Sequence, residues 1–539
     1  MGQSTDQFTW HRRQRWLFGL VVLLGVVLRF TNLLHKPVWI DEAFSLFHLS
    51  GFTQAIASQH LVTGAVIQTP ELLSYQAPHA ATNLLMMLRN IGDTAPELPP
   101  LYFALLYGWS QLFGWSQLFG DGLVALRALS ALFSLAALPA MYWLCRELFG
   151  RSHAAWYGVA LMAISPFHLL VAQEIRPYSL WTLLLLVTTA FLVRARRSGR
   201  WSDWLGFSLG LTAAFYTHVL TLLPAVAYGL ATLLQVRGNR SRLRQFGGAI
   251  LVSALGFLPW LWYGFLRPIA RPTPHVLAHT SRFGILQGIA QSVTRFFADF
   301  NLGMESPHWA LALYALLILG VFVLIVKSFL SLWRRESWEV RSLLLSLAIV
   351  PILGLVGSDA MVNTSRTLFT RYYLPSMIAI EATIGYGLAA RRSRPTPQIT
   401  PPQITPPQTI PRLWPRRWWI LLLVGTLSCT WFVLSPNWWH KTRTVADACI
   451  QSRTAPTAEQ PQATIVTDEF FMRSLGLVHQ LDPTVQFRFY PIASQQAPTI
   501  DQPASYLYMP SQAFAQALGQ RYDLKPVCAP ELWSITPKS

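Results

Sequence analysis

The sequence predicts an all-α polytopic membrane protein, with about 11 transmembrane helices plus interfacial helices, and a small α/β extracytoplasmic domain at the C-terminal end. Two observations predict this class. First, 52% of the 539 residues are hydrophobic and only 12% are charged, whereas about 25% of the residues of a soluble globular protein are charged. Second, apolar runs of membrane-spanning length recur as far as residue 435 and are absent from the polar sequence that follows.

The formal net charge of +18 would suggest nucleic-acid binding in a soluble protein. In this chain the Lys and Arg residues cluster between the apolar runs, which is the pattern that membrane topology produces. We therefore interpret the basic balance as a topology signal and expect no nucleic-acid partner.

Each candidate span is an apolar run long enough to cross the hydrocarbon core of a bilayer. The candidate spans are residues 16–34, 122–145, 152–172, 178–195, 203–218, 219–236, 246–264, 309–330, 340–357, 372–390 and 418–435. With residues 1–15 as a cytoplasmic N-terminus, every basic cluster between these spans falls on the cytoplasmic side. The first run lacks a small-residue cleavage pattern after it and is interpreted as an uncleaved span.

Residues 99–119 are apolar and aromatic but do not fit as a span, because counting them would place the following basic loops outside. We expect an interfacial helix on the outer surface, within a first outer loop over residues 35–121. Pro99 and Pro100 suit its first turn, and WSQLFG occurs twice in succession, at 109–114 and 115–120.

The chain continues with a Pro-rich segment over residues 391–417, which predicts an extended cytoplasmic linker. After the last span at 418–435, residues 436–539 are expected to form an extracytoplasmic domain that acts as a lid or a packing domain. Strands are expected at 463–467, 485–490 and 505–509, and a helix at 511–521. Cys449 and Cys528 flank this region, so a disulfide between them is a hypothesis for an oxidising compartment.

Asp41 and Glu42 follow the first span on the outer side, in the sequence WIDEAF. Carboxylates this close to a membrane surface cost free energy unless they are solvated or paired, so the pair is either a hydrated loop start or part of a site. Glu97 precedes two prolines, where it either complements a helix dipole or contacts a metal or a donor.

Two arginines at the outer ends of spans run against the positive-inside bias. Arg176, in QEIRPYS, could pair with Glu174 or bind a phosphate through its planar fork. Arg371, in RYYLP, could be a snorkelling anchor or a second phosphate ligand. A lone His218 between two spans is interpreted as a core hydrogen bonder, and His279 on an outer loop either ligates a metal or has no role.

The order of these motifs resembles the GT-C membrane glycosyltransferases of family 39 type, which include protein O-mannosyltransferases and the aminoarabinose transferases of lipid A. The likeness rests on the acidic pair after the first span, the Pro-Pro aromatic helix, RALSALFSLAALPAMYWLCRELFG, SPFHLLVAQEIRPYSL and RYYLP. It covers roughly residues 15–390, so residues 16–390 are expected to form a GT-C-like catalytic domain.

The resemblance implies a polyprenyl-phosphate sugar as donor and a lipid, glycan or protein acceptor on the outer face. Asp41 matches the catalytic acidic residue of that family and Glu42 is its customary neighbour, so Asp41 and Glu42 are the expected catalytic residues. The residues expected to bind the donor phosphate and sugar are Glu174, Arg176, Tyr178, Arg371 and Tyr372. No cofactor is required, and Glu97 and His279 are the candidate ligands of a divalent metal. Leu98 stands where the aminoarabinose transferases have Lys, which argues against transferring their substrate to this chain.

These residue types suit an inverting displacement. Asp41 would take the proton of the attacking hydroxyl, and an arginine would stabilise the lipid-phosphate leaving group. The alternative is a non-enzymatic transporter or lipid flippase, which would bury ionisable residues at the bilayer midplane and show repeated halves. A third hypothesis is that the chain is an inactive relative in a glycan-assembly complex. The expected location is the bacterial inner (plasma) membrane.

Overall fold

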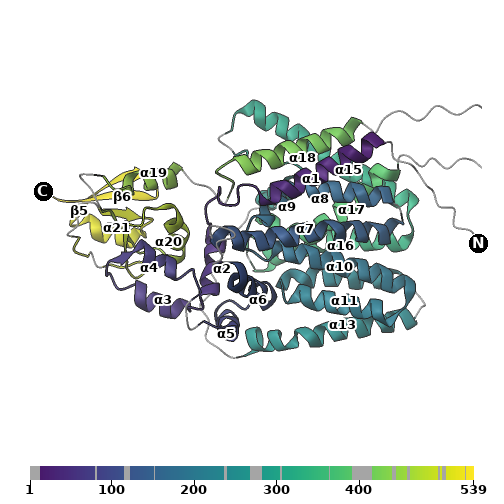
Figure 1. Ribbon diagram of the computed structural model, residues 1–539, viewed down its shortest axis with the longest axis horizontal. Coiled ribbons are helices and arrows are strands. Elements are labelled where there is room, and N and C mark those ends of the chain that lie inside the picture. The colour runs from purple at the N-terminus through teal and green to yellow at the C-terminus, as the bar shows by residue number, and fades with distance from the viewer. Residues whose placement is uncertain are drawn as a thin grey trace, which may run out of the picture.

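The structure is a computed structural model. It describes residues 12–78, 82–114, 122–150, 152–235, 240–267, 282–303, 306–362, 364–390, 416–439, 445–457, 462–495, 498–500, 505–528 and 530–538. A bundle of long helices forms one part, and a smaller domain with a sheet forms the other (Figure 1). The Pro-rich segment up to residue 415 and His279 lie outside the described residues.

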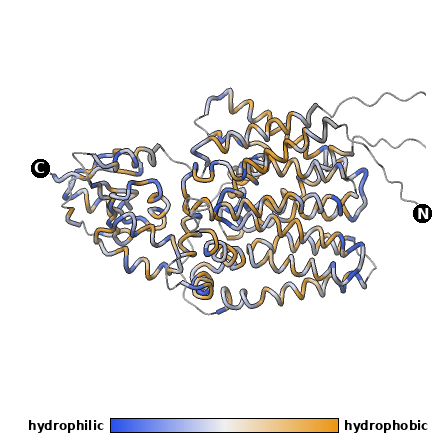
Figure 2. The backbone as a smooth tube through the Cα atoms, viewed as in Figure 1, coloured by the Kyte–Doolittle hydropathy of each residue, from blue (hydrophilic) through white to orange (hydrophobic). Residues whose placement is uncertain are grey.

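All eleven expected spans coincide with helices of the bundle. These helices are α1 (Arg12–Phe30), α7 (Gly122–Phe149), the pair α8 (Ser152–Ala163) and α9 (Pro166–Ala172), α10 (Tyr178–Ser198), α11 (Trp201–Phe215), α12 (Leu222–Gln235), α13 (Arg240–Leu261), α15 (His308–Arg335), α16 (Trp338–Val362), α17 (Leu374–Ala390) and α18 (Arg416–Leu434). Their residues are predominantly apolar (Figure 2). A short 3-10 turn, η2 (Val219–Thr221), precedes α12, and a π turn, η3 (Trp262–Leu266), ends α13.

By length and composition alone, five of the described helices can cross a membrane, or six if the bent pair α8–α9 counts as one span. Some of the other ranges form shorter helices because breaks interrupt the apolar runs, whereas α1 and α18 border residues that the structure does not describe. His218, for example, caps η2 between α11 and α12 through its Nδ1, which accepts a hydrogen bond from the backbone of Leu220. The chain is therefore a multi-pass membrane protein in which several helices are shorter than a full crossing.

The break between α8 and α9 is built by a specific set of polar groups. Pro166 cannot continue the helix, and the two halves meet at a 60° bend. Arg29 of α1 is fully buried, and its guanidinium donates to the carbonyls of Met162 and Ala163 at the end of α8, where the last carbonyls of a helix lack part of their usual helical partners. The bend sets the direction of α9, and the loop that carries Glu174 and Arg176 follows α9 directly.

The first loop forms a compact cap at one end of the bundle. Its elements are α2 (Ile40–Ser50), α3 (Gln54–Leu61), β1 (Ile67–Gln68), α4 (Thr69–Ser74), α5 (Leu84–Thr94), α6 (Pro100–Trp109) and the π turn η1 (Ser110–Gly114). Helix α6 and η1 cover the described part of the expected interfacial helix. The beginning of α1 lies at the opposite end of the bundle (Figure 1).

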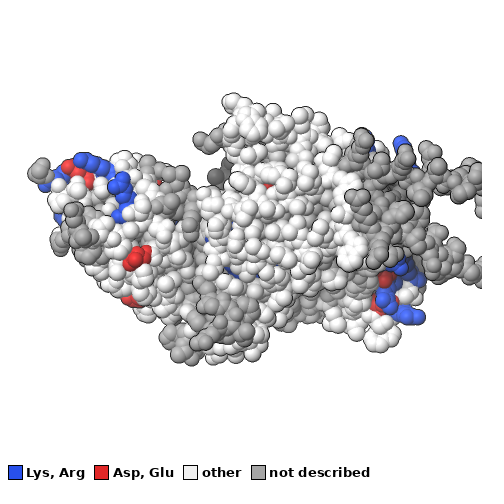
Figure 3. Space-filling view, turned by 45° about the horizontal axis from the view of Figure 1, so that its top comes forward, with Lys and Arg blue, Asp and Glu red and all other residues white. Residues whose placement is uncertain are grey.

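Two further segments complete the bundle. Helix α14 (Arg282–Arg295) lies in the loop before α15, and the 3-10 turns η4 (Arg366–Leu368) and η5 (Thr370–Tyr373) connect α16 to α17. The middle of the bundle surface is almost free of charged side chains, whereas Lys and Arg gather at the end away from the small domain (Figure 3).

The small domain contains a six-stranded mixed sheet of order β1-β3-β2-β4-β6-β5. Its strands are β2 (Thr464–Thr467), β3 (Gln486–Phe489), β4 (Ser505–Tyr508), β5 (Tyr522–Cys528) and β6 (Leu532–Pro537), and its helices are α19 (Val445–Thr454), α20 (Phe471–Leu477), η6 (Val478–Gln480) and α21 (Gln512–Gly519). The three expected strands are β2, β3 and β4, and the expected helix is α21. The edge strand β1 comes from the first loop and pairs antiparallel with β3.

The small domain also packs directly on α2. Phe47 and Phe44 of α2 meet Phe471 and Phe470, with ring centroids 5.9 and 6.1 Å apart. A Cβ at Gly476 would lie 3.0 Å from the carbonyl oxygen of Val38, so only glycine allows this close approach. The helix that carries Asp41 and Glu42 is therefore held between the bundle and the C-terminal domain.

Cys449 and Cys528 form a disulfide that ties α19 to β5, as the sequence hypothesis required. The bridge closes a loop with a sequence separation of 79 residues, and in the chain-entropy treatment such a loop stabilises a fold by about 4 kcal/mol. We predict that the Cys449→Ser and Cys528→Ser double variant lowers the free energy of unfolding of the C-terminal domain by about 2–4 kcal/mol. Thermal unfolding with and without reductant measures this, and a double variant as stable as the unreduced wild type would contradict it.

Candidate active site

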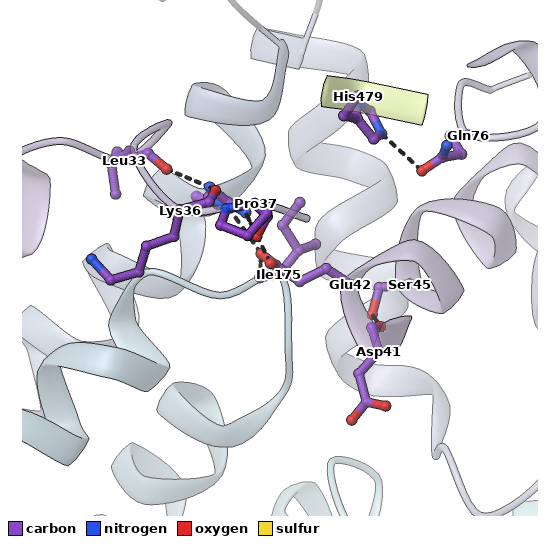
Figure 4. Close-up of polar contacts among 10 residues, drawn as sticks. Leu33, Lys36, Pro37, Asp41, Glu42, Ser45, Gln76, Ile175 and His479 are labelled. Atoms are coloured by element: carbon purple, nitrogen blue, oxygen red, sulfur yellow. Dashed lines mark hydrogen bonds and ion pairs between the residues drawn. The ribbon is translucent and has the colours of Figure 1, made fainter. Parts of the chain in front are cut away.

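Helix α2 places its two carboxylates in opposite surroundings. Asp41 and Glu42 lie in its first turn, where negative charge complements the helix dipole. The Asp41 carboxylate points away from the cluster of contacts around Glu42 (Figure 4). Glu42 is fully buried, whereas the Asp41 side chain is 20% exposed. Asp41 is therefore the member of the pair that a ligand can reach.

Glu42 forms a buried ion pair with Arg127 of α7. The Nε and Nη2 atoms of Arg127 each donate to a carboxylate oxygen of Glu42 at 2.9 Å. Glu42 Oε1 also accepts the backbone N–H of Ile175 at 3.0 Å, and Arg127 Nη1 donates to the carbonyls of Leu33 and Lys36. One buried pair thus joins the end of α1, the start of α2, α7 and the loop between α9 and α10.

Asp41 meets two arginines that come from distant parts of the sequence. Its Oδ2 lies 3.6 Å from Arg176 Nη2 and 3.2 Å from Arg371 Nη1. Arg176 also donates through Nη1 to the carbonyl of Asp41 and to the Ser45 hydroxyl, at 3.1 and 3.2 Å. Arg371 also interacts with the Glu174 carboxylate, so the two guanidinium groups face two carboxylates, Asp41 and Glu174.

Arg371 is surrounded by aromatic rings. Its guanidinium carbon lies 4.7 to 5.8 Å from the ring centroids of Trp39, Tyr178, Phe369 and Tyr372. Burial would lower the pKa of Arg371, but the Tyr178 phenol and the Asp41 carboxylate raise this pKa above its ordinary value. Arg371 is therefore charged in spite of its burial, and the rings restrict the directions in which it can point.

Both arginines retain an unused donor. The Nε atoms of Arg176 and Arg371 are buried and have no hydrogen-bond partner within the described part of the chain. An unsatisfied buried donor costs about 1–3 kcal/mol, and more when it is charged. Arg196 and Arg267 share this feature, and what distinguishes Arg176 and Arg371 is that both lie against one carboxylate, that of Asp41.

A cavity of about 220 Å³ lies beside Arg371. Arg371 and Glu174 line it together with Arg295, Phe369 and Trp439. The Arg295 guanidinium stacks 3.3 Å from the Trp439 ring centroid and donates to the Thr370 hydroxyl at 3.3 Å. The cavity therefore combines two guanidinium groups with apolar and aromatic walls.

The structure brings most of the predicted site residues together. Asp41, Arg176 and Arg371 form one ion-pair cluster, Tyr178 and Tyr372 flank Arg371, and Glu174 shares the cavity with Arg371. Glu97 lies on an exposed turn before α6. Its proposed metal partner His279 lies outside the described residues, and the residues that are described contain no group of three or more His, Cys, Asp and Glu side chains able to hold a metal.

Arg127 and Arg295 were missed by the sequence prediction. Arg127 lies within an apolar run, and a charged residue inside a membrane span is by default a functional or structural candidate, so this signal was available. Arg295 ends helix α14 in the loop before α15, and it lies outside the motifs that indicated the other site residues.

Comparisons with known proteins agree with this architecture. Residues 99–263 match a family model described as dolichyl-phosphate-mannose-protein mannosyltransferase. The apo crystal structure of ArnT from Cupriavidus metallidurans is similar with a TM-score of 0.57 and 13% identity, over 97% of this chain and 98% of that chain. No curated protein sequence matches.

Two further solved structures are similar at lower scores. ArnT from Cupriavidus metallidurans bound to undecaprenyl phosphate gives a TM-score of 0.49 and 15% identity, over 97% of this chain and 98% of that chain. The apo oligosaccharyltransferase of Archaeoglobus fulgidus gives a TM-score of 0.48 and 12% identity, over 90% of this chain and 65% of that chain.

The buried pair of Glu42 and Arg127 predicts a large effect of a small change. Glu42→Gln removes the negative charge and leaves Arg127 buried without a counter-ion, so we expect a loss of about 3–5 kcal/mol in the free energy of unfolding. The matched control is Glu147→Gln, because Glu147 and Arg197 form a partly exposed pair at 4.0 Å, whose loss should cost about 1 kcal/mol or less. Equal decreases in melting temperature for the two variants would contradict the prediction, because the buried pair of Glu42 would then stabilise the fold no more than the exposed pair of Glu147.

His48 of α2 predicts a pH dependence of stability. Burial, and to a smaller extent the charge of Arg176, lowers the pKa of His48 to about 4. The neutral form therefore contributes stability that is fully present above about pH 6.5 and is lost as the pH falls towards 4. In a series of melting curves, His48→Phe should remove up to about 3 kcal/mol of this acid-induced loss. A variant with the same pH profile as the wild type would contradict the assignment.

Proposed function

We propose, from the premise that this chain is a membrane glycosyltransferase of the GT-C type, that it moves a sugar from a polyprenyl-phosphate donor to an acceptor at the outer face of the membrane. One observation carries the proposal. Asp41 lies between two buried arginines that each keep an unsatisfied Nε donor. A base beside an anion site is what transfer from a sugar phosphate requires.

The donor phosphate would bind Arg371 and Arg176. Guanidinium groups bind phosphate through paired N–H donors, and the buried Nε atoms of both arginines have no partner among the described residues. The cavity beside Arg371 adds Arg295 and the rings of Phe369 and Trp439, which suit a ligand that is anionic at one end and apolar along its chain. Glu174, Tyr178 and Tyr372 would contact the donor or hold Arg371 in place.

Donor binding would also prepare Asp41 for its role. In the structure the Asp41 carboxylate is engaged by both arginines, which weakens it as a base. A phosphate that takes up the arginine donors competes with Asp41 for the positive charge, and this raises the proton affinity of Asp41. The base would therefore become active only when the donor is present.

The transfer would be a single displacement. The acceptor hydroxyl attacks the anomeric carbon and gives its proton to Asp41, and the bond from that carbon to the phosphate oxygen breaks. The electron pair leaves with the polyprenyl phosphate, where Arg371 and Arg176 stabilise the added negative charge. Attack opposite the leaving group inverts the anomeric centre, as in inverting glycosidases.

Glu42 has a different role in this proposal from the catalytic one that the motif implied. Both of its oxygens are engaged inside the protein, so Glu42 would act as a positioning residue for Asp41 and Arg176. No step is assigned to a metal, and Glu97 and His279 stay a prediction.

The bacterial inner membrane is the proposed location, with the N-terminus in the cytoplasm and the C-terminal domain outside. Two features support this orientation. Basic residues gather at the end of the bundle away from the C-terminal domain (Figure 3), in agreement with the positive-inside rule. The disulfide in the C-terminal domain suits an oxidising compartment.

The proposal predicts that Asp41→Asn abolishes transfer without abolishing donor binding. Loss of a general base typically lowers kcat by about 10²–10⁴-fold, while the arginines of the phosphate site are retained. Purified full-length chain is assayed in nanodiscs with undecaprenyl-phosphate sugars labelled in the sugar and with bacterial envelope glycolipid extract as acceptor. The product is analysed by NMR for the inverted anomer.

Asp523→Asn is the matched control, because Asp523 is an exposed carboxylate on β5. It should transfer sugar at the wild-type rate. Undiminished turnover in Asp41→Asn, or a product with retained configuration, would remove Asp41 from the mechanism.

A further inference from the structure

A second cavity lies in the C-terminal domain, away from the Asp41 cluster. The domain has a parallel core of strands in the order β3-β2-β4. After β2 the chain forms β3 on one side of it and then crosses to form β4 on the other side. In open parallel sheets, ligands bind outside the carboxyl ends of the strands at such a switch point.

The cavity occupies this position. It has a volume of about 410 Å³ and is lined by Glu469, which follows β2, and by Leu507 and Met509 at the end of β4. Trp533 of β6 and Glu531 line it as well. This volume falls within the range of about 300–1,000 Å³ that small-ligand sites occupy.

The walls are fixed by contacts inside the domain. Met509 has a φ of 42°, a left-handed conformation that is strained for a non-glycine residue. Its backbone N–H donates to the carbonyl of Glu531 at 2.7 Å. Trp533 donates its indole N–H to the carbonyl of Pro530 at 3.1 Å, so the ring can offer a ligand only its apolar surface.

The polar groups of the cavity are of one kind. Glu469 and Glu531 supply carboxylate oxygens, which accept hydrogen bonds. The Glu469 side chain is 29% exposed and lies 3.4 Å from Arg473, and Glu531 is half-buried. A fitting ligand therefore presents hydrogen-bond donors along one edge and weakly positive C–H groups towards the negative face of an indole ring.

We propose that this cavity binds a saccharide that carries no acidic groups. The hydroxyl or amino groups of such a sugar would donate to Glu469 and Glu531, and the C–H face of its ring would stack on Trp533. Glu531 would repel the acidic group of a uronic acid or a phosphorylated sugar, whereas the charge of Glu469 is partly balanced by Arg473. The site is separate from the transfer chemistry, since it uses no residue of the Asp41 cluster, and it would hold glycan close to the helix that carries Asp41.

Saturation-transfer NMR and calorimetric titration of the full chain in nanodiscs test this proposal. The probes are chitotriose, its fully deacetylated amine form and trigalacturonic acid. We expect one or both of the first two to bind and the acidic trimer not to bind. Trp533→Ala should weaken the binding at least about tenfold, equivalent to about 1.4 kcal/mol, while Trp533→Phe should retain most of it.

Three further variants separate the explanations. Trp309→Ala removes a 69% exposed tryptophan of α15 and should leave the affinity unchanged. The Glu469→Gln and Glu531→Gln double variant is a second test that does not depend on the folding of Trp533→Ala. It should weaken binding of the amine probe at least about tenfold. Asp41→Asn should bind the probes normally, so failure of the transfer mechanism and failure of this site give different results. Absence of binding by all three probes, tighter binding of the acidic trimer, or binding indifferent to Trp533 and the two glutamates would overturn the proposal.

Discussion

The site depends on the buried ion pair between Glu42 and Arg127. Two charges without solvent are stable only when their remaining hydrogen bonds are satisfied, and here the backbone supplies them from three directions. The N–H of Ile175 and the carbonyls of Leu33 and Lys36 complete the pair. Because Asp41 precedes Glu42 and Arg176 follows Ile175, fixing this pair also fixes the base and one of its arginines.

The other arginine is brought in by a different part of the fold. Arg371 lies in the 3-10 turn before α17, and its position is set by the rings of Trp39, Tyr178, Phe369 and Tyr372. The C-terminal domain holds the helix that carries Asp41 in place, because α2 packs on α20 and strand β1 of the first loop joins the sheet. The site is therefore shared between the bundle, the loops and the small domain, and no single segment would form it alone.

Local patterns were sufficient to predict much of this arrangement. Apolar runs located the helices, and the motifs around Asp41, Arg176 and Arg371 identified groups that the fold brings into one cluster. The sequence could not show that Glu42 is enclosed, because its partner Arg127 lies 85 positions away in a different helix. Nor could it show that Ile67 and Gln68 complete a sheet whose other strands begin after residue 463, since such pairing is decided by tertiary packing.

The C-terminal domain is more closely joined to the rest of the chain than a lid appended to a membrane bundle would be. Its sheet begins with a strand from the first loop, so the domain cannot fold into its full form without that loop. Its packing on α2 joins the proposed base to a domain with a cavity of its own. Because α20 packs directly on α2, a movement of this domain would shift the helix that carries Asp41.

A structure of the full chain with a bound polyprenyl phosphate tests the central claim most directly. The account predicts the phosphate oxygens at about 3 Å from the guanidinium nitrogens of Arg371 and Arg176, with the lipid chain leaving past Phe369 and Trp439 and with Asp41 released from at least one arginine. A phosphate bound away from both arginines, with the contacts of Asp41 unchanged, would contradict it.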